Sequence, residues 1–228
     1  MTPPPPQPAR RRAGRSHAIL EAFTRRVASY GYDGTHFGDI ATELGISKGL
    51  IVHHYGTKDQ LLLALHRSYM QRRLAEAHDI TARLEQPPRQ LAGLLYAFML
   101  YQQVDRDATV AFQRETHRIS QQPEGLELRR AYLELVRGIL RAGQGSGAFR
   151  SGDVEQRSLF VLGTTQWAWT WFDRDGPASA VELGAGLVDL VLGGLLARRT
   201  ALPALADPTG DVAATVASCL DVVGGAPT

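Results

Sequence analysis

Hydrophobic residues recur every three or four positions along most of the chain, with polar residues between them. Ile19, Phe23 and Val27 repeat at every fourth residue, and the same kind of spacing recurs in 37–44 and from residue 61 onward. Such spacing places apolar side chains on one face of a helix. Because no segment shows the two-residue alternation of a half-buried strand, the pattern predicts an all-α fold.

Glycine, proline and aspartate clusters divide the chain into separate helices. Gly31–Gly34 and Pro87–Pro88 are the clearest of these breaks. The pattern predicts helices at about 16–30, 58–84, 89–104, 107–120, 124–142, 154–173 and 178–198, and one weaker helix at about 212–223. The glycines at 143–147 follow a helix, so they are interpreted as a helix terminus and not as a nucleotide-binding loop.

Residues 35–55 contain the signals of two short helices joined by a tight turn. Thr35 is predicted to cap the first helix, Gly45 supplies the backbone freedom for the turn, and Ser47 is predicted to cap the second helix. A helix, a short glycine-containing turn and a second helix form a helix-turn-helix. This unit presents its second helix to the major groove of DNA.

The run I-A-T-E-L-G-I-S-K-G-L-I-V-H-H-Y-G-T-K-D-Q-L-L at 40–62 resembles the DNA-binding signature of the TetR family of transcriptional regulators. The matching positions are Ile40, Ala41, Leu44, Gly45, Ile46, Ser47, Gly49, His54, Tyr55, Lys58, Leu61 and Leu62. Val52 stands where the family usually has a tyrosine, so the phosphate contact of that hydroxyl is absent or is supplied by His53. The resemblance covers about residues 16–65.

The pattern and the resemblance together predict a small DNA-binding head and a larger trunk. A disordered Pro/Arg-rich arm is expected at 1–15, because proline is incompatible with a helix interior. The helix-turn-helix domain is expected at 16–62, and a helical ligand-binding and dimerisation domain at 63–200. A C-terminal tail with a possible short helix is expected at 201–228.

Charge is distributed unevenly between these parts. The chain carries a net charge of +2, but residues 1–60 alone sum to +3. A basic head on a near-neutral body suits a protein that binds phosphates with one end. The arginine run at 10–15 is either a solvated charge run or an arm that reaches phosphates or the minor groove, and its place before the helix-turn-helix favours the arm.

The second helix of the motif is predicted to read bases. Lys48 is expected to donate to guanine O6 or N7, Leu50 to pack on a thymine methyl group, and Gly49 to allow close approach. Hydroxyl, imidazole and ammonium groups nearby are expected to anchor phosphates. The predicted DNA-binding residues are Arg11, Arg12, Arg15, Thr35, Ser47, Lys48, Gly49, Leu50, His53, His54, Tyr55 and Lys58.

Two features of the trunk carry further predictions. Aromatic residues concentrate at 167–172, and a wide apolar stripe runs along 183–195. Core packing or a dimer interface explains the aromatic group at least as well as a pocket does, and two such helices from each of two subunits would form a four-helix interface, as TetR-like proteins do. The predicted dimer-interface residues are Trp171, Leu183, Leu187, Leu190, Val191 and Leu195. The predicted pocket residues are Phe98, Met99, Gln102, Phe112, Thr116, Tyr132, Gln166 and Trp167.

Several classes of protein are not indicated. Cys219 is the single cysteine, and the sequence shows neither a secretory signal nor an apolar run of membrane-spanning length, so a cytoplasmic protein is expected. His53 and His54 point about 100° apart on a helix and cannot easily share a metal ion. With no catalytic constellation in evidence, the prediction is a non-enzyme without metal or cofactor.

The predicted function is a ligand-responsive transcriptional regulator of the TetR type. As the resemblance implies, a homodimeric repressor would bind a palindromic double-stranded operator and be released by a small, hydrophobic effector. The alternative is a ligand-binding helical protein with a degenerate DNA-binding head, which the valine at position 52 keeps open.

Overall fold

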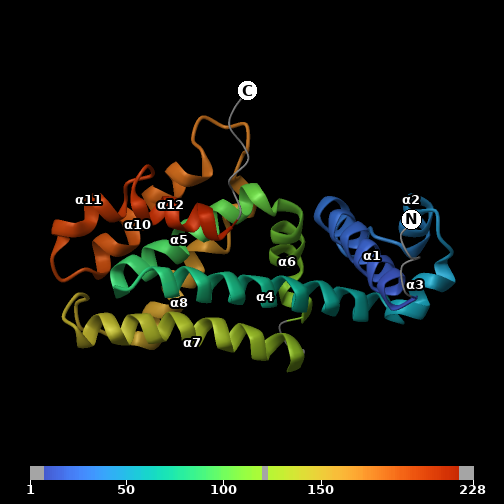
Figure 1. The fold of residues 1–228 in the computed structure, drawn as a ribbon, viewed down its shortest axis with the longest axis horizontal. Coiled ribbons are helices and arrows are strands. Elements are labelled where there is room, and N and C mark those ends of the chain that lie inside the picture. The colour runs from blue at the N-terminus through green and yellow to red at the C-terminus, as the bar shows by residue number, and fades with distance from the viewer. Residues whose placement is uncertain (1–7, 120–122, 221–228) are drawn as a thin grey trace, which may run out of the picture.

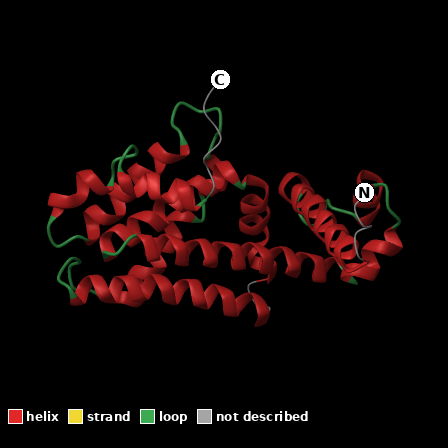
Figure 2. Ribbon diagram, viewed as in Figure 1, coloured by secondary structure: helices red, strands yellow, loops and turns green. Residues whose placement is uncertain are grey.

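The computed structural model describes residues 8–119 and 123–220, with side chains at 14–119 and 126–220. Apart from one isolated bridge between Phe149 and Leu196, the regular structure in these ranges is helical (Figure 2). The helices are α1 (Pro8–Tyr30), α2 (Phe37–Leu44), α3 (Lys48–Tyr55), α4 (Lys58–Arg83), α5 (Pro87–Val104), α6 (Arg106–Ile119), α7 (Pro123–Gly145), α8 (Val154–Thr165), α9 (Ala168–Trp171), α10 (Ala180–Leu195), the 3₁₀ turn η1 (Arg199–Ala201), α11 (Leu202–Leu205) and α12 (Asp211–Cys219). The predicted all-α fold is confirmed.

The molecule is elongated and has two parts, which α4 joins (Figure 1). The head consists of α1, α2 and α3 at one end, and the trunk consists of α5 to α12. The head core comprises Ile19, Phe23, Val27, Ile40 and Ile51, each fully buried, together with Leu61, Leu62 and Leu65 from the first turns of α4. Part of the head core is therefore supplied by α4, the helix that continues into the trunk.

The turn of the helix-turn-helix forms as predicted, but its first cap does not. Gly45 has φ 62°, a left-handed conformation that glycine adopts without strain. The Ser47 hydroxyl accepts a hydrogen bond from the Leu50 amide at 3.2 Å. Thr35 does not cap α2: its hydroxyl is fully buried and donates to the Gly31 carbonyl at 2.8 Å, and His36 occupies the cap position. The hydroxyl therefore bonds to the preceding turn at 31–34 and not to the amides of α2.

Helix α1 begins earlier than predicted. It starts at Pro8, not near Ser16, so residues 8–15 are helical where a disordered arm was expected. Proline is tolerated in the first turn of a helix because its missing amide has no partner there. The arginines and alanines that follow have high helix propensity. Residues 1–7 of the predicted arm lie outside the described range.

The start of α4 is held by a reciprocal capping box. The Thr57 hydroxyl accepts from the Gln60 amide at 3.2 Å, and the Gln60 side chain accepts from the Thr57 amide at 3.1 Å. These bonds satisfy two amides that a helix start leaves unpaired. The helix then runs for 26 residues and ends before Pro87, where α5 begins.

Helix α5 is the centre of the trunk. Its residues from Leu91 to Ala97 are all buried, because α4, α7, α10 and α12 pack around it. A Cβ atom at Gly184 of α10 would lie 2.7 Å from Tyr96 of α5, so this glycine allows the two helices to approach closely. The expected tail is partly trunk: α12 buries Val212 and Val216 against the core. Residues 221–223 of the helix predicted there lie outside the described range.

The predicted helix at 154–173 is two helices. Helix α8 ends at Thr165, and the short α9 begins at Ala168. The break places Ala168 and Phe172 in the core and leaves Trp167 69% exposed. Among the described residues, no helix has both the length and the apolarity that a bilayer crossing requires.

Candidate DNA-binding surface and ligand cavity

Helix α3 buries one side and exposes the other. Ile51 is fully buried in the head core, whereas Ser47, Lys48, Gly49 and His53 are exposed. In Figure 1, α2 and α3 lie at the end of the molecule farthest from the trunk. We call these four exposed residues the α3 face; they lie together, where a nucleic acid duplex can reach them.

Gly49 leaves open space on the α3 face. A Cβ atom built there would meet only the Ser47 hydroxyl, at 3.8 Å. The neighbouring Lys48 lays its aliphatic stem beside Gly38 of α2, where a Cβ atom would lie 2.9 Å from the Lys48 Cε atom. The fold itself therefore tolerates a small side chain at 49, and the stem of Lys48 is supported by α2.

Three predicted phosphate contacts are engaged within the protein. Thr35 is buried, as described above, and has no surface to offer to DNA. The Tyr55 hydroxyl donates to the Ser16 carbonyl and accepts from the Ser16 hydroxyl, both at 2.8 Å. The Lys58 ammonium lies 4.2 Å from the centre of the Tyr32 ring. Thr35 and Tyr55 therefore stabilise the head through these hydrogen bonds.

The other predicted DNA contacts differ in exposure. Leu50 and His54 are half-buried, and Arg15 is exposed on α1. The side chains of Arg11 and Arg12 lie outside the described residues, although the backbone of both belongs to α1.

Ion pairs that the sequence analysis did not anticipate fix α1 against α2. Arg25 pairs with Glu43 at 2.7 Å, and Arg26 pairs with Asp39 at 3.0 Å. These arginines sit seven residues or more before the motif, so spacing along one helix gives no signal for pairing across two.

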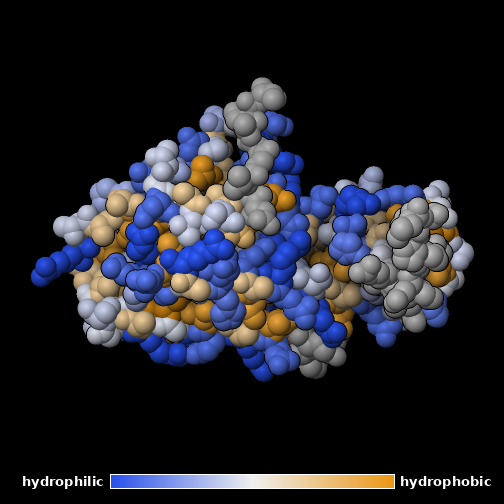
Figure 3. Space-filling view, in the orientation of Figure 1, coloured by the Kyte–Doolittle hydropathy of each residue, from blue (hydrophilic) through white to orange (hydrophobic). Residues whose placement is uncertain are grey.

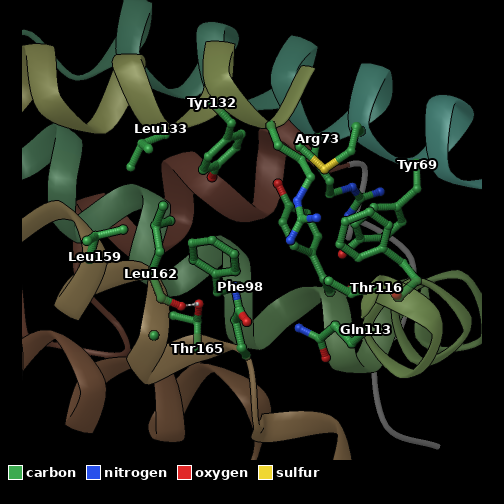
Figure 4. Close-up of a pocket in the computed structure, with 16 residues that line it drawn as sticks. Tyr69, Arg73, Phe98, Gln113, Thr116, Tyr132, Leu133, Leu159, Leu162 and Thr165 are labelled. Carbon is green, nitrogen blue, oxygen red and sulfur yellow. Dashed lines mark hydrogen bonds between the residues drawn. The ribbon is translucent and has the colours of Figure 1, made fainter. Parts of the chain in front are cut away.

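Within the trunk, α4 to α8 enclose a cavity of about 420 Å³ (Figure 4). Its walls are formed by Tyr69, Met70, Arg73, Phe98, Tyr101, Phe112, Gln113, Thr116, Arg129, Tyr132, Leu133, Leu159, Leu162, Gly163, Thr165 and Gln166. A volume of this size is typical of small-molecule sites.

Of the predicted pocket residues, Phe98, Phe112, Thr116, Tyr132 and Gln166 line this cavity. Met99, Gln102 and Trp167 do not. Met99 and Gln102 are buried on another side of α5, and Trp167 turns outward because the chain breaks between α8 and α9. Helical spacing identifies a buried residue, but it does not show whether that residue faces a cavity or solid core.

The sequence analysis missed the charged cluster at the cavity wall. Arg73 is only 4% exposed; its guanidinium pairs with Asp105 at 2.9 Å and with Glu76 at 3.2 Å. The guanidinium carbon lies 3.7 Å from the centre of the Tyr101 ring. Burial raises the pKa of both carboxyl groups. The charge of Arg73 opposes the shift at Glu76, and the charges of Arg72 and then Arg73 oppose it at Asp105, which also pairs with Arg72 at 2.6 Å. Glu76 follows Arg73 by three residues on α4, a spacing that sequence can reveal. Asp105 lies on the α5–α6 link, and no sequence spacing indicates its pairing with Arg73.

His66 lies beside the cavity on α4 and is 2% exposed. Its ring packs on Phe112, with 4.6 Å between the ring centres. Burial, and secondly the charge of Arg129, lower the pKa of His66 to about 3. The imidazole is therefore neutral at physiological pH.

Large apolar side chains are exposed on α8, on α10 and around α9, and those of α8 and α10 border one groove. Phe160, Trp167, Trp171 and Leu190 are each more than half exposed, and a groove of about 490 Å³ runs between α8 and α10. We call these four residues the α8–α10 surface. Of the predicted dimer residues, Trp171 and Leu190 are exposed, Leu183, Leu187 and Val191 are half-buried, and Leu195 is buried. The sequence analysis missed Phe160, although the run Leu159–Leu162 has more apolar residues than one helix face can bury.

Figure 3 shows hydrophobic residues exposed on a further part of the surface. Hydrophobic residues there form a band where α4 and α7 lie in Figure 1, with hydrophilic residues around them.

Within the described ranges no group of three or more His, Cys, Asp or Glu side chains is arranged to hold a metal ion.

Comparison with known families identifies both parts of the chain. Residues 19–65 match the model of bacterial regulatory proteins of the tetR family, and residues 85–195 match the tetracyclin repressor-like C-terminal domain. Together the matches span the head and most of the trunk.

Individual relatives extend over most of the chain. The HTH-type transcriptional repressor KstR2 of Mycolicibacterium smegmatis is 28% identical over 199 residues, which is 84% of this chain and 93% of KstR2. The solved structure of the ketosteroid transcriptional regulator KstR2 of Mycobacterium tuberculosis superposes with a TM-score of 0.71 at 26% identity and covers 81% of this chain and 96% of that one. AibR, solved in complex with isovaleryl coenzyme A and operator DNA, superposes with a TM-score of 0.66 over 77% of this chain and 97% of its own. At 23% identity, AibR shows the shared fold only.

Proposed function

The chain belongs to the TetR family of transcriptional regulators, and we propose that it is a repressor that binds a palindromic operator as a homodimer and is released by a small-molecule effector. That it is a DNA-binding regulator follows from the family. The relative KstR2 of Mycolicibacterium smegmatis is a transcriptional repressor, which supports a regulator and not an enzyme here as well. A regulator of chromosomal genes works in the cytoplasm, which is where we place it.

The observation that carries the proposal is the exposed α3 face at the far end of the head. Ser47, Lys48, Gly49 and His53 are all exposed, whereas Ile51 on the other side of the same helix is buried. Residues at the start of a recognition helix contact base edges in the major groove. Lys48 is exposed with the end of its side chain beside Gly38 of α2, and from this position its ammonium can donate to guanine.

We propose the α8–α10 surface as the dimer interface. Leu190 is 71% and Phe160 69% exposed, which is unusual for large apolar side chains in a monomer. A two-fold interface uses the same patch on both subunits. The resulting pair of heads would address two half-sites of a palindrome.

We propose that α6 and α4 together transmit the effector signal. Phe112, Gln113 and Thr116 of α6 line the cavity. On the same helix, Glu115 accepts a hydrogen bond from the Tyr32 amide of the head at 2.9 Å, and Arg118 pairs with Asp33. Figure 1 shows α6 standing across the junction between trunk and head. A ligand that displaces α6 would therefore change the position of the head.

The proposal is tested by the salt dependence of duplex binding. A regulator that makes about six to ten phosphate contacts should lose roughly 10³–10⁵ in affinity between 50 and 200 mM salt. A ligand-binding protein with a degenerate head, the alternative that Val52 raises, would show no such dependence. Val52 is 49% exposed on α3, beside the α3 face.

Two lysine variants separate base reading from anchoring. Lys48→Ala should reduce the preference for the operator over random duplex, whereas Lys58→Ala should weaken binding to all sequences alike. Equal effects of the two variants on specificity would contradict the role proposed for α3.

A further inference from the structure

The walls of the trunk cavity carry positive charge without matching negative charge. Arg73 and Arg129 line the cavity, and no aspartate or glutamate is among its lining residues. The charge of Arg73 is neutralised by ion pairs with Glu76 and Asp105, which do not line the cavity. Arg129, which is half-buried, makes no ion pair or hydrogen bond with the described part of the chain.

Burial acts on Arg129 without compensation. Desolvation lowers the pKa of its guanidinium, and the same charge helps to lower the pKa of the neighbouring His66. An arginine remains protonated in spite of such a shift. A charge that is partly removed from water and has no partner is less stable than a paired one, so an anion from outside the chain would stabilise it.

A second polar group in the cavity also lacks a partner. Tyr132 is 6% exposed, and its hydroxyl makes no hydrogen bond in the structure. Its ring lies edge-on to Phe98, with 6.0 Å between ring centres. Buried hydroxyls are normally hydrogen-bonded, so the free Tyr132 hydroxyl points to an oxygen or nitrogen atom of a ligand.

Most of the apolar and most of the polar labelled residues lie at different ends of the cavity. Figure 4 shows Leu133, Leu159 and Leu162 on one side, with Thr165 beside them, and Tyr69, Arg73, Gln113 and Thr116 on the other, with Tyr132 between. A ligand that fills the whole cavity must therefore be amphipathic.

We propose that this cavity binds an amphipathic organic anion. Its carboxylate or phosphate group pairs with Arg129, its apolar body packs on Phe98, Leu159 and Leu162, and the Tyr132 hydroxyl bonds to a polar atom of the ligand. This inference rests on the proposed function of the same cavity, and it replaces a merely hydrophobic effector with an acidic one. A cationic ligand is disfavoured because it would face Arg129 with no carboxylate in the cavity wall.

The test compares ligands that share one alkyl chain and differ in the head group. Decanoate, decyl phosphate, decanol and decylammonium are titrated into the full-length protein without DNA, and binding is measured by calorimetry. The anions should bind at least about tenfold tighter than decanol, because charge-assisted hydrogen bonds are strong in a partly buried site. The stronger of the two anions identifies the head group.

Matched variants assign the effect to one residue. Arg129→Met keeps the bulk and removes the charge, so it should abolish the preference for anions, whereas Arg129→Lys should retain part of it. Arg130, exposed on the same helix, supplies the control Arg130→Met, which should leave the preference unchanged. Thermal unfolding of each variant verifies that it is folded.

The contradicting results are specific. Decanol binding as tightly as the anions, an anion preference that survives Arg129→Met, or no anion binding up to about 1 mM would overturn the inference. Operator binding is measured separately: if the anions bind but leave DNA affinity unchanged, the proposed regulation fails and the ligand assignment holds.

Discussion

The head and the trunk place their charges in opposite ways. In the head, Arg25 and Arg26 pair with acids at the surface, and the α3 face stays exposed. In the trunk, Arg73 pairs with its acids in the interior, where it is 4% exposed. Exposed charged residues of the head can bind DNA phosphates, whereas the buried ion pairs of the trunk form part of the cavity wall. The difference also decides how strongly each region responds to mutation.

The largest expected effect concerns the α8–α10 surface. Leu190→Glu or Phe160→Glu would place a charge in the proposed dimer interface, and an unpaired buried charge costs several kcal/mol. We expect the dimer to dissociate and operator affinity to fall by about 100-fold or more. Analytical ultracentrifugation measures the first effect and fluorescence anisotropy the second. The exposed Val104 offers the control Val104→Glu, which should leave the dimer intact. A wild-type protein that is monomeric at micromolar concentration would contradict this interface.

The next effect compares buried and exposed ion pairs directly. Arg73→Met removes the ion pair of Glu76, whereas Asp105 keeps Arg72 at 2.6 Å. One part-buried acid is then left without its partner, so we expect the free energy of unfolding to fall by about 2 kcal/mol. Arg25→Met in the head removes an exposed pair with Glu43 and should cost less than about 1 kcal/mol. Urea unfolding measures both. Equal losses would mean that burial does not distinguish the two regions.

A third prediction concerns pH and His66. Its folded-state pKa of about 3 lies below the ordinary value of 6.5. Below pH 6.5 the unfolded chain binds a proton that the folded chain excludes, so stability that is fully present above pH 6.5 is lost progressively as pH falls toward 3. The loss should be about 1.4 kcal/mol per pH unit.

Unfolding at pH 7.0 and 4.5 measures this loss. Relative to His66→Gln, the wild-type protein should lose about 2.5 kcal/mol more on acidification. The exposed His53 in the head provides the control His53→Gln, which should follow the wild-type curve. Parallel curves for wild type and His66→Gln would show that this imidazole does not titrate as its burial requires.

The smallest expected effect separates two glycines of the head. Gly45→Ala forces a side chain into a backbone with φ 62° and should destabilise the fold by about 1 kcal/mol. Gly49→Ala meets open space, so it should leave stability nearly unchanged and weaken operator binding instead. Thermal unfolding and anisotropy assays on both variants distinguish the roles. Unaltered DNA affinity in Gly49→Ala would argue against close approach at this position.

The same contrast explains what could be predicted from the sequence. The helix-turn-helix depends on local chemistry, such as the left-handed Gly45 and the Ser47 cap, and both were predicted correctly. Thr35 was assigned wrongly because a threonine hydroxyl can either accept from an amide of the helix that follows or donate to a nearby carbonyl, and here it donates to the Gly31 carbonyl.

The cavity depends on contacts between distant segments. Arg73 meets Asp105 across 32 positions of the sequence, and Arg129 reaches the same cavity from α7. Helical periodicity shows that Phe98 and Tyr132 are inside, but only the packing of α4 to α8 shows that they border a void. The acidic preference inferred for the ligand could not be derived from composition, because it depends on which arginine has a partner.

The most direct test of the central claim is selection of bound duplexes from a random pool by the wild-type protein, followed by sequencing. If the α3 face of each subunit reads a major groove, the recovered sequences should share an inverted repeat with half-sites about one helical turn, or a multiple of it, apart. The same selection with Lys48→Ala should give a weaker consensus. Recovered sequences that do not differ from the starting pool would contradict the account.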